Sequence, residues 1–321
     1  MPVYVNTNYS ALQGQRYLGN VQNQLTTTYQ RLSSGMRINS AKDDAAGLQI
    51  ADRLTSQING LNQGNRNASD GIALAQTMEA GMDEISGMLQ KIRTLTVQAA
   101  NGTNTMEDRT ALGKEIASLA TEVNRIARQT TFAGKSILNG KAAGSIFGEP
   151  AGGANNKLHG DAGTMTLQVG SNKGDTISFT ANSVMFSSIG AANNDLIKSD
   201  GSAFFHTTAT GEVKVAVDKL EYSNTTKNNY VGNVIGYVDA MIATIDGYRA
   251  DLGAIQNRLE SSIRNQSNVA ANEADARSRI RDADFAEESA NLSQQSIIQQ
   301  AAASMLMQAN TRPQLGLSLL G

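Results

Sequence analysis

The residues best suited to chemistry in this sequence are a short run similar to a phosphate-binding loop and two histidines. Residues 133–136 read AGKS, as such a loop ends, but Gln129 stands where the motif needs its first glycine. Without that glycine the backbone cradle for a phosphate is incomplete. His159 and His206 are the only histidines, and neither belongs to a two-histidine metal motif. We interpret both as loop residues.

An acidic cluster near the C-terminal end is the remaining candidate for a site. Asp282, Asp284, Glu287 and Glu288 lie close together, but they lack the ligand spacing and the glycine of a calcium loop. Negative side chains favour the N-terminus of a helix electrostatically. We therefore expect a helix to begin here, and the sequence predicts no catalytic, cofactor-binding or metal-binding residue. The protein is not expected to be an enzyme.

Composition narrows the remaining classes of protein. The 321 residues include no Cys and no Trp, only 5% are aromatic, and the formal net charge is −2. The absence of a basic stripe argues against a nucleic-acid partner. The first ten residues lack the basic and apolar regions of a cleaved signal peptide, and no apolar run has membrane-spanning length. We expect a soluble chain that is either cytosolic or exported without a signal peptide.

The elements that would position any site begin with a first helix. Its apolar positions alternate by three and four residues, as a coiled-coil seam requires, and they are Leu18, Val21, Leu25 and Leu32. Residues 33–35, SSG, predict the end of this helix. Residues 40–43, SAKD, have the spacing of a capping box for the next.

The second helix is predicted from about Ala45 to Ala99, with the same kind of seam. At about 1.5 Å per residue it would be about 80 Å long, which is far beyond a typical globular helix. Residues 101–102, NG, end it, and residues 105–108, TMED, can cap a third helix that runs antiparallel to the second.

A change of periodicity after Thr130 predicts β-structure. Met165, Leu167 and Val169 alternate with polar residues, as do Ile177 and Phe179, which predicts a hairpin over 164–184. Val213, Val215 and Val217 suggest another strand. Residues 187–229 are rich in Asn, Ser, Thr and Gly, so we expect a small, loop-rich surface excursion.

Helical order returns in an unbroken seam from Val234 to Val269, followed by a final amphipathic helix around 292–309. The predicted fold is mainly α. Long coiled-coil-like helices from both termini pair into a rod that carries a β-hairpin and a small irregular α/β insertion. The stripes of the two terminal helices are expected to lack partners within the chain and to contact other subunits. Their candidate assembly residues are Leu18, Val21, Leu25, Leu32, Ile298 and Leu306.

Four segments resemble one known family. Residues 31–47 read RLSSGMRINSAKDDAAG, residues 252–258 read LGAIQNR, residues 276–286 read ARSRIRDADFA and residues 317–320 read LSLL. The first segment closely resembles the signature that follows the first helix of bacterial flagellins, and the others are similar to flagellin C-terminal segments. The resemblance covers both ends and the hairpin, and it leaves mainly 187–229 unmatched.

This resemblance implies a domain organisation. Residues 1–42 and 278–321 would form the inner helices of the filament core. Residues 43–185, with the hairpin, and 230–277 would form the rod, and 186–229 the short variable surface region. It also implies an extracellular subunit of the flagellar filament, secreted by type III export without a cleaved signal peptide.

The resemblance further implies partners. These are the chain itself in a helical homopolymer, the flagellar cap and hook-associated proteins, and an export chaperone at the C-terminal helix. Lys91, Leu95 and Glu115 correspond to flagellin positions that contact the vertebrate flagellin-sensing Toll-like receptor and overlap an intersubunit surface. Lysine replaces the usual arginine at position 91, which keeps the charge but loses the planar fork.

Three alternatives compete with a filament subunit. A hook-associated junction protein shares the terminal helices, but the continuous signature and the compact middle favour a flagellin. A flagellin with a catalytic insertion is disfavoured by the short middle without a metal motif. For a cytosolic coiled-coil scaffold, the hairpin and the flagellin segments would be coincidental.

Overall fold

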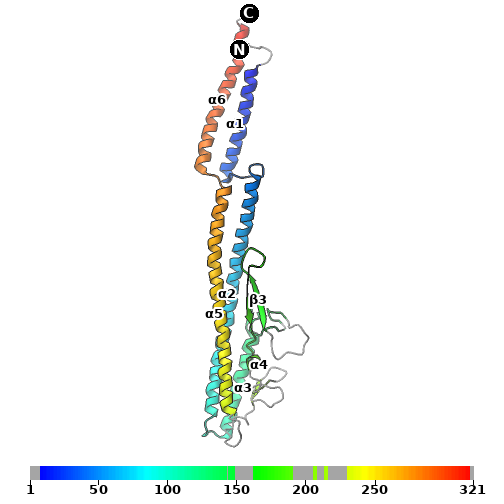
Figure 1. Ribbon diagram of the computed structural model, residues 1–321, viewed down its shortest axis with the longest axis vertical. Coiled ribbons are helices and arrows are strands. Elements are labelled where there is room, and N and C mark those ends of the chain that lie inside the picture. Colours follow the sequence, from blue (N-terminus) through cyan, green and yellow to red (C-terminus); the bar gives the residue numbers. More distant parts are fainter. Residues whose placement is uncertain are drawn as a thin grey trace. The chain divides into compact units, whose positions relative to one another are not determined.

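The computed structural model describes residues 8–142, 144–148, 162–190, 205–207, 213–215 and 230–318. The chain divides into two compact units. Unit 1 comprises Met1–Asn59 and Asn268–Gly321, and unit 2 comprises Gly60–Ser267. Long helices dominate both, with short antiparallel strand pairs in unit 2 (Figure 1). The predicted mainly α fold with a β-hairpin is confirmed.

Unit 1 contains the two terminal helices, α1 (Tyr9–Ser34) and α6 (Phe285–Ser318). The Asn8 side chain caps α1 by accepting a hydrogen bond from the Ala11 amide, and Gly35 ends the helix in the left-handed conformation at φ 70°, which suits glycine. The Asp284 carboxylate accepts from the amides of Ala286 and Glu287. The acidic cluster thus begins a helix, as the sequence predicts.

The helices α2 (Ala45–Ala99) and α5 (Tyr230–Arg281) each contribute residues to both units. The bounds predicted for the second helix are confirmed. In unit 2 the two helices run antiparallel, because Asn65 pairs with Ser267 whereas Arg93 pairs with Asp239. The third helix, α3 (Met106–Gln129), begins with the predicted capping box at Thr105 and Asp108.

The predicted capping box at residues 40–43 is wrong. Helix α2 begins after Asp44, whose carboxylate accepts from the Gly47 amide at 2.9 Å. The Asp43 carboxylate instead closes a turn by accepting from the amides of Asn39 and Ser40. Hydrogen bonds from the Ser40 backbone, from the Asn39 backbone and from the Ser40 hydroxyl hold the pKa of Asp43 below its usual value. Asp44 therefore caps α2 and Asp43 closes the preceding turn, and the sequence pattern alone did not show which aspartate has which role.

The phosphate-loop-like residues form a tight hairpin. Strands β1 (Thr131–Phe132) and β2 (Lys135–Ser136) pair antiparallel across Ala133 and Gly134, both at positive φ. Two residues at positive φ are typical of the turns that join two-residue hairpins. The described residues directly after Ser136, 137–142, form no helix, so the strand-to-helix geometry of a phosphate loop is missing there.

The larger hairpin joins β3 (Gly163–Gln168) to β4 (Thr176–Ala181), with Met165 opposite Phe179 and Leu167 opposite Ile177. It lies against glycines of α2. A Cβ at Gly60 would come within 2.7 Å of the Ser171 Cβ, and one at Gly64 would overlap the Val169 carbonyl. The Asn67 amide donates to the Gln168 carbonyl at 2.9 Å. The close approach of the hairpin to α2 therefore depends on glycines at the points of contact.

The described parts of 186–229 correct the expectation of a surface excursion. The segment includes α4 (Phe186–Gly190), β5 (Phe205–Thr207) and β6 (Val213–Val215). Ile189, Phe205 and Val213 are all buried, and the rings of Phe186 and Phe205 pack edge to face with centroids 4.7 Å apart. The Asn124 side chain on α3 accepts from the Phe186 amide. Scattered apolar residues in a polar stretch thus complete the core of unit 2, while Val217 lies outside the described residues.

The core of unit 2 joins α2, α3 and α5 to the strands through one continuous apolar cluster. Met78, Met82, Ile85, Leu89 and Ile92 of α2 are almost completely buried, and each such side chain stabilises the fold by about 1.5–3 kcal/mol. Val234, Val238, Met241, Ile245 and Leu259 of α5 face the same cluster. The predicted seams of these helices are confirmed at these residues, whereas Val269, the predicted end of the α5 seam, is exposed.

We predict opposite effects of two glycine substitutions in α2. Gly64→Ala should lower the free energy of unfolding by about 1–3 kcal/mol, because the new methyl group displaces the hairpin. Gly87→Ala should raise the free energy of unfolding by about 1 kcal/mol, because a Cβ at Gly87 would meet nothing within 4 Å and alanine favours helix. Thermal and denaturant unfolding measure both. Equal effects would show that the hairpin does not rest on Gly64.

Candidate assembly surface

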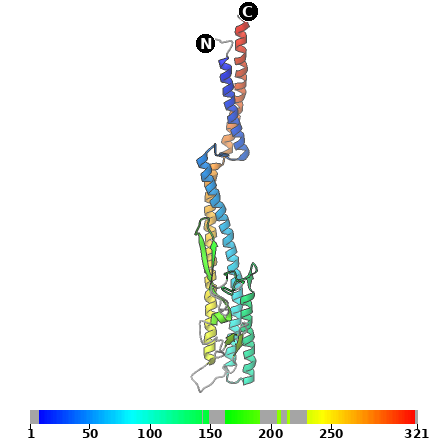
Figure 2. The ribbon, with the colours of Figure 1, turned by 90° about the vertical axis from the view of Figure 1, so that its right-hand side faces the viewer.

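The candidate site is built on the antiparallel pair of α1 and α6, two helices of unit 1 that lie side by side in both views (Figures 1 and 2). The Asn8 side chain donates to the Ala309 carbonyl at 2.8 Å. The Thr28 hydroxyl donates to Gln295 at 3.3 Å. These contacts fix the register of the pair along most of the length of α1.

A partly buried ion pair holds the opposite end of the same seam. The Arg31 guanidinium lies 3.1 Å from the Glu288 carboxylate, whose side chain is only 9% exposed. A charge buried this far must keep its partner, because removing one partner of a buried pair is strongly destabilising. Arg31 and Glu288 thus specify how α1 and α6 pair.

The expectation that the terminal stripes lack partners within the chain is wrong, because α1 and α6 cover each other. Val21 and Leu25 are buried, and Leu18, Leu32, Ile298 and Leu306 are partly buried. A Cβ at Gly14 would lie 3.2 Å from the Leu306 Cδ1. Leu306 therefore packs where α1 has no side chain.

The seam nevertheless buries little apolar surface. In α1 and the described side chains of α6, only Val21, Leu25 and Ala302 are fully buried apolar residues. Each buried aliphatic side chain contributes about 1.5–3 kcal/mol, which is small against the entropy lost by ordering two long helices. The pair alone has a thin core.

Most large apolar side chains of this pair lie outside the seam. Eight of the twelve exposed large apolar residues in the described part of the chain belong to α1 and α6, and each of the eight is more than half exposed. We call them the outer apolar set: Tyr9, Leu12, Tyr17, Tyr29, Phe285, Ile297, Met305 and Met307. Such a concentration marks an interaction surface.

Sequence reasoning missed the outer apolar set because it followed the heptad seam. These residues do not keep the spacing of three and four that marks the seam. The signal that could have found them is the number of large apolar residues left over once the seam is assigned. On a water-facing helix surface those positions are usually polar.

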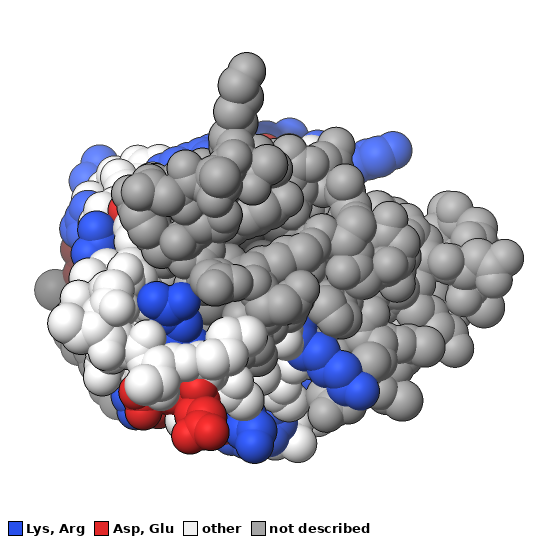
Figure 3. Space-filling model, turned by 90° about the horizontal axis from the view of Figure 1, so that it is seen from below, with Lys and Arg blue, Asp and Glu red and all other residues white. Residues whose placement is uncertain are grey.

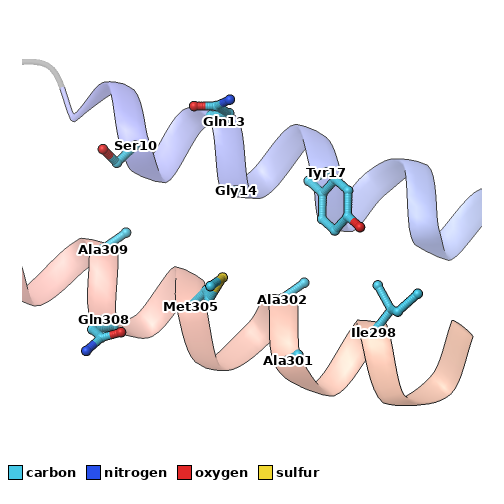
Figure 4. Close-up of a pocket in the computed structure, with 10 residues that line it drawn as sticks. All are labelled: Ser10, Gln13, Gly14, Tyr17, Ile298, Ala301, Ala302, Met305, Gln308 and Ala309. Atoms are coloured by element: carbon cyan, nitrogen blue, oxygen red, sulfur yellow. The ribbon is translucent and has the colours of Figure 1, made fainter. Parts of the chain in front are cut away.

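A groove between the two helices adds shape to this surface (Figure 4). It has a volume of about 580 Å³. Small residues of both helices leave the space open, and Tyr17 of α1 and Met305 of α6 point into it from opposite sides. The groove lining is Ser10, Gln13, Gly14, Tyr17, Ile298, Ala301, Ala302, Met305, Gln308 and Ala309. We call it the small-residue groove.

The residues transferred from flagellin receptor contacts form a second group, in unit 2. The Lys91 ammonium lies 3.1 Å from the Glu115 carboxylate, joining α2 to α3, and their side chains are 59% and 47% exposed. Leu95 is only 8% exposed. The structure thus brings the two charges together on the surface and places Leu95 beneath it.

The described residues hold no group of three His, Cys, Asp or Glu side chains placed to bind a metal ion. None of the described helices is long and apolar enough to cross a membrane. His159 lies outside the described residues, and the His206 backbone pairs with Lys214 between β5 and β6. Charges of both signs share the described part of the face in Figure 3.

Comparisons with known proteins agree with this geometry. Residues 5–143 match the bacterial flagellin N-terminal helical region, and residues 235–320 match the C-terminal helical region. Flagellin D of Vibrio anguillarum is 37% identical and flagellin A of Vibrio cholerae is 38% identical, each over the full length of both chains.

A solved structure, that of a putative flagellar hook-associated protein from Vibrio parahaemolyticus, shares the fold. Its TM-score is 0.52 at 16% identity, and the match covers 75% of this chain and 100% of that one. At this identity the likeness concerns the fold alone.

Proposed function

Because this chain belongs to the bacterial flagellin family and is a structural subunit of the flagellar filament, we propose that the α1–α6 pair makes its main subunit contacts. The observation that carries the proposal is the outer apolar set, which is concentrated on this pair and stays exposed in the single chain. Neighbouring subunits would bury these side chains and complete the thin core of the pair.

The small-residue groove supports a second copy of the chain as the occupant. Its sides are apolar at Ile298 and Met305, and Ala301 and Ala302 allow close approach of another helix. Its polar lining residues, Ser10, Gln13 and Gln308, lie toward one end (Figure 4). Since filament subunits are identical, the outer apolar side chains of a neighbour are present at every such groove.

The domain assignment follows from the same proposal. We infer that 1–42 and 278–321 form the inner filament contacts, that 43–185 and 230–277 form the adjoining helical domain, and that 186–229 is its short variable part. The buried side chains of 186–229 imply that shortening this segment disturbs the core of unit 2.

Further partners and the route of secretion are proposed on family grounds. The filament of flagellins is extracellular, and we infer type III export of this subunit without a cleaved signal peptide. The cap and hook-associated proteins would contact the same terminal helices at the filament ends. An export chaperone would cover the apolar side chains of α6 before assembly, which agrees with their exposure in the single chain.

We predict that Ile297→Lys blocks filament growth. Ile297 is 67% exposed, so the α1–α6 pair should fold normally, while a buried unpaired charge at every subunit contact should reduce filament yield at least about tenfold. Sedimentation after seeding measures the yield, and circular dichroism checks the fold. The matched control is Met106→Lys on α3, at a residue 50% exposed outside the pair. Normal filaments from Ile297→Lys would contradict the proposal.

We also propose that the unassembled chain is recognised by the vertebrate flagellin-sensing Toll-like receptor through Lys91 and Glu115, with Leu95 supporting them from below. The exposed charge pair supports this proposal. Leu95 is too buried to be a main contact.

Reversing either charge, in Lys91→Glu or Glu115→Lys, should reduce receptor activation at least about tenfold. The reversed side chain would carry the same sign of charge as the receptor group that binds the original one, and like charges at an interface repel each other. Reporter-cell dose–response curves measure this. The double exchange restores the ion pair but not the surface pattern, so it should stay weak. Full receptor activation by the double exchange would show that the single variants act by destabilising the fold. Unchanged receptor activation by both single variants would show that Lys91 and Glu115 are not a receptor contact.

A further inference from the structure

Methionine exposure in this chain is uneven. Met78, Met82, Met185 and Met241 are buried. Met106, Met305 and Met307 are 50%, 72% and 67% exposed. Thioether oxidation follows exposure, so these three are the described methionines most open to a dissolved oxidant.

Only one of the three lies in the small-residue groove. Met305 lines it and points toward α1 in Figure 4. Met307 lies two residues on, about 200° around the helix, and so faces elsewhere. Met106 belongs to α3 in unit 2. The chain therefore offers two exposed methionines as internal controls for the third.

We propose that Met305 is a reversible oxidation site through which peroxides stop the subunit from assembling. The inference rests on the proposed assembly surface. Hydrogen peroxide would transfer one oxygen to the Met305 sulfur, which loses two electrons and becomes a sulfoxide. The O–O bond breaks, and the leaving hydroxide takes the proton of the transferred oxygen and departs as water.

The physical consequence follows from the groove around the sulfur. A sulfoxide is polar and larger than a thioether. Met305 lines the groove beside the apolar Ala301, Ala302 and Ile298, and Tyr17 and Gln308 of the same lining carry side-chain donors. A neighbouring subunit that packs apolar side chains against the sulfoxide would remove this polar group from water and would meet a larger side chain, which is unfavourable. Met305 is 72% exposed in the single chain, so we expect its oxidation to leave the fold of the single chain unchanged.

The test treats unassembled full-length chain with dilute hydrogen peroxide and maps the sulfoxides by mass spectrometry. Seeded filament yield should fall at least about tenfold once Met305 is oxidised. Because Met307 also belongs to the outer apolar set, Met305 is tested in its absence: the double variant Met305→Leu and Met307→Leu should keep its yield under the same treatment. The single variants Met307→Leu and Met106→Leu, which keep Met305, should lose as much as the wild type. Treatment with methionine sulfoxide reductases of both stereospecificities should restore wild-type assembly.

Two outcomes would overturn the inference. The first is wild-type chain that is oxidised at Met305 and still assembles fully. The second is a loss of yield in the treated double variant, Met305→Leu and Met307→Leu, that equals the loss in treated Met307→Leu. Its failure is separable from failure of the assembly surface. If Ile297→Lys assembles normally, the surface itself is wrong, whereas if Ile297→Lys fails and oxidation has no effect, only the role of Met305 is wrong.

Discussion

The antiparallel pairing of α1 and α6 is the constraint on which the assembly properties of this chain depend. Hydrogen bonds near the start of α1 and the Arg31–Glu288 ion pair near its end fix the register. Polar contacts specify a pairing without adding much stability, since each is worth only about 0.5–1.5 kcal/mol net. The apolar seam between them is thin. Register and stability thus come from different sources, and much of the stability is left for neighbouring subunits to supply.

Unit 2 differs from the α1–α6 pair in the size of its core. Its helices and short strands surround a continuous apolar cluster, so we expect its stability to depend little on other subunits. Glycines on α2 let the β3–β4 hairpin approach the helix backbone, and a buried edge-to-face pair of phenylalanines joins α4 to β5. A self-sufficient domain joined to an incompletely buried helix pair suits a subunit that must be soluble before assembly and cohesive afterwards.

The sequence predicted what periodicity and local capping control. The length of α2 follows from its apolar seam and its end from the Asn101-Gly102 pair, and the start of α3 follows from the reciprocal bonds of Thr105 and Asp108. It did not predict how neighbouring residues of the same type divide local roles, or which residues are buried by distant partners. Asp43 and Asp44 have similar chemistry, and only the folded chain shows which one caps α2. Phe205 is one apolar residue in a polar stretch, and its burial depends on Phe186 and the core beyond it.

The candidate assembly surface was also predicted only in part from the sequence. Heptad spacing identified Val21 and Leu25 as seam residues, but it cannot say that the partner helix belongs to the same chain. The central claim is that neighbouring subunits bury the outer apolar set. Hydroxyl-radical footprinting of unassembled chain and of filaments, read by mass spectrometry, tests it at Leu12, Tyr17 and Ile297. The account predicts strong labelling in the single chain and protection at all three in filaments, and equal labelling in both states would contradict it.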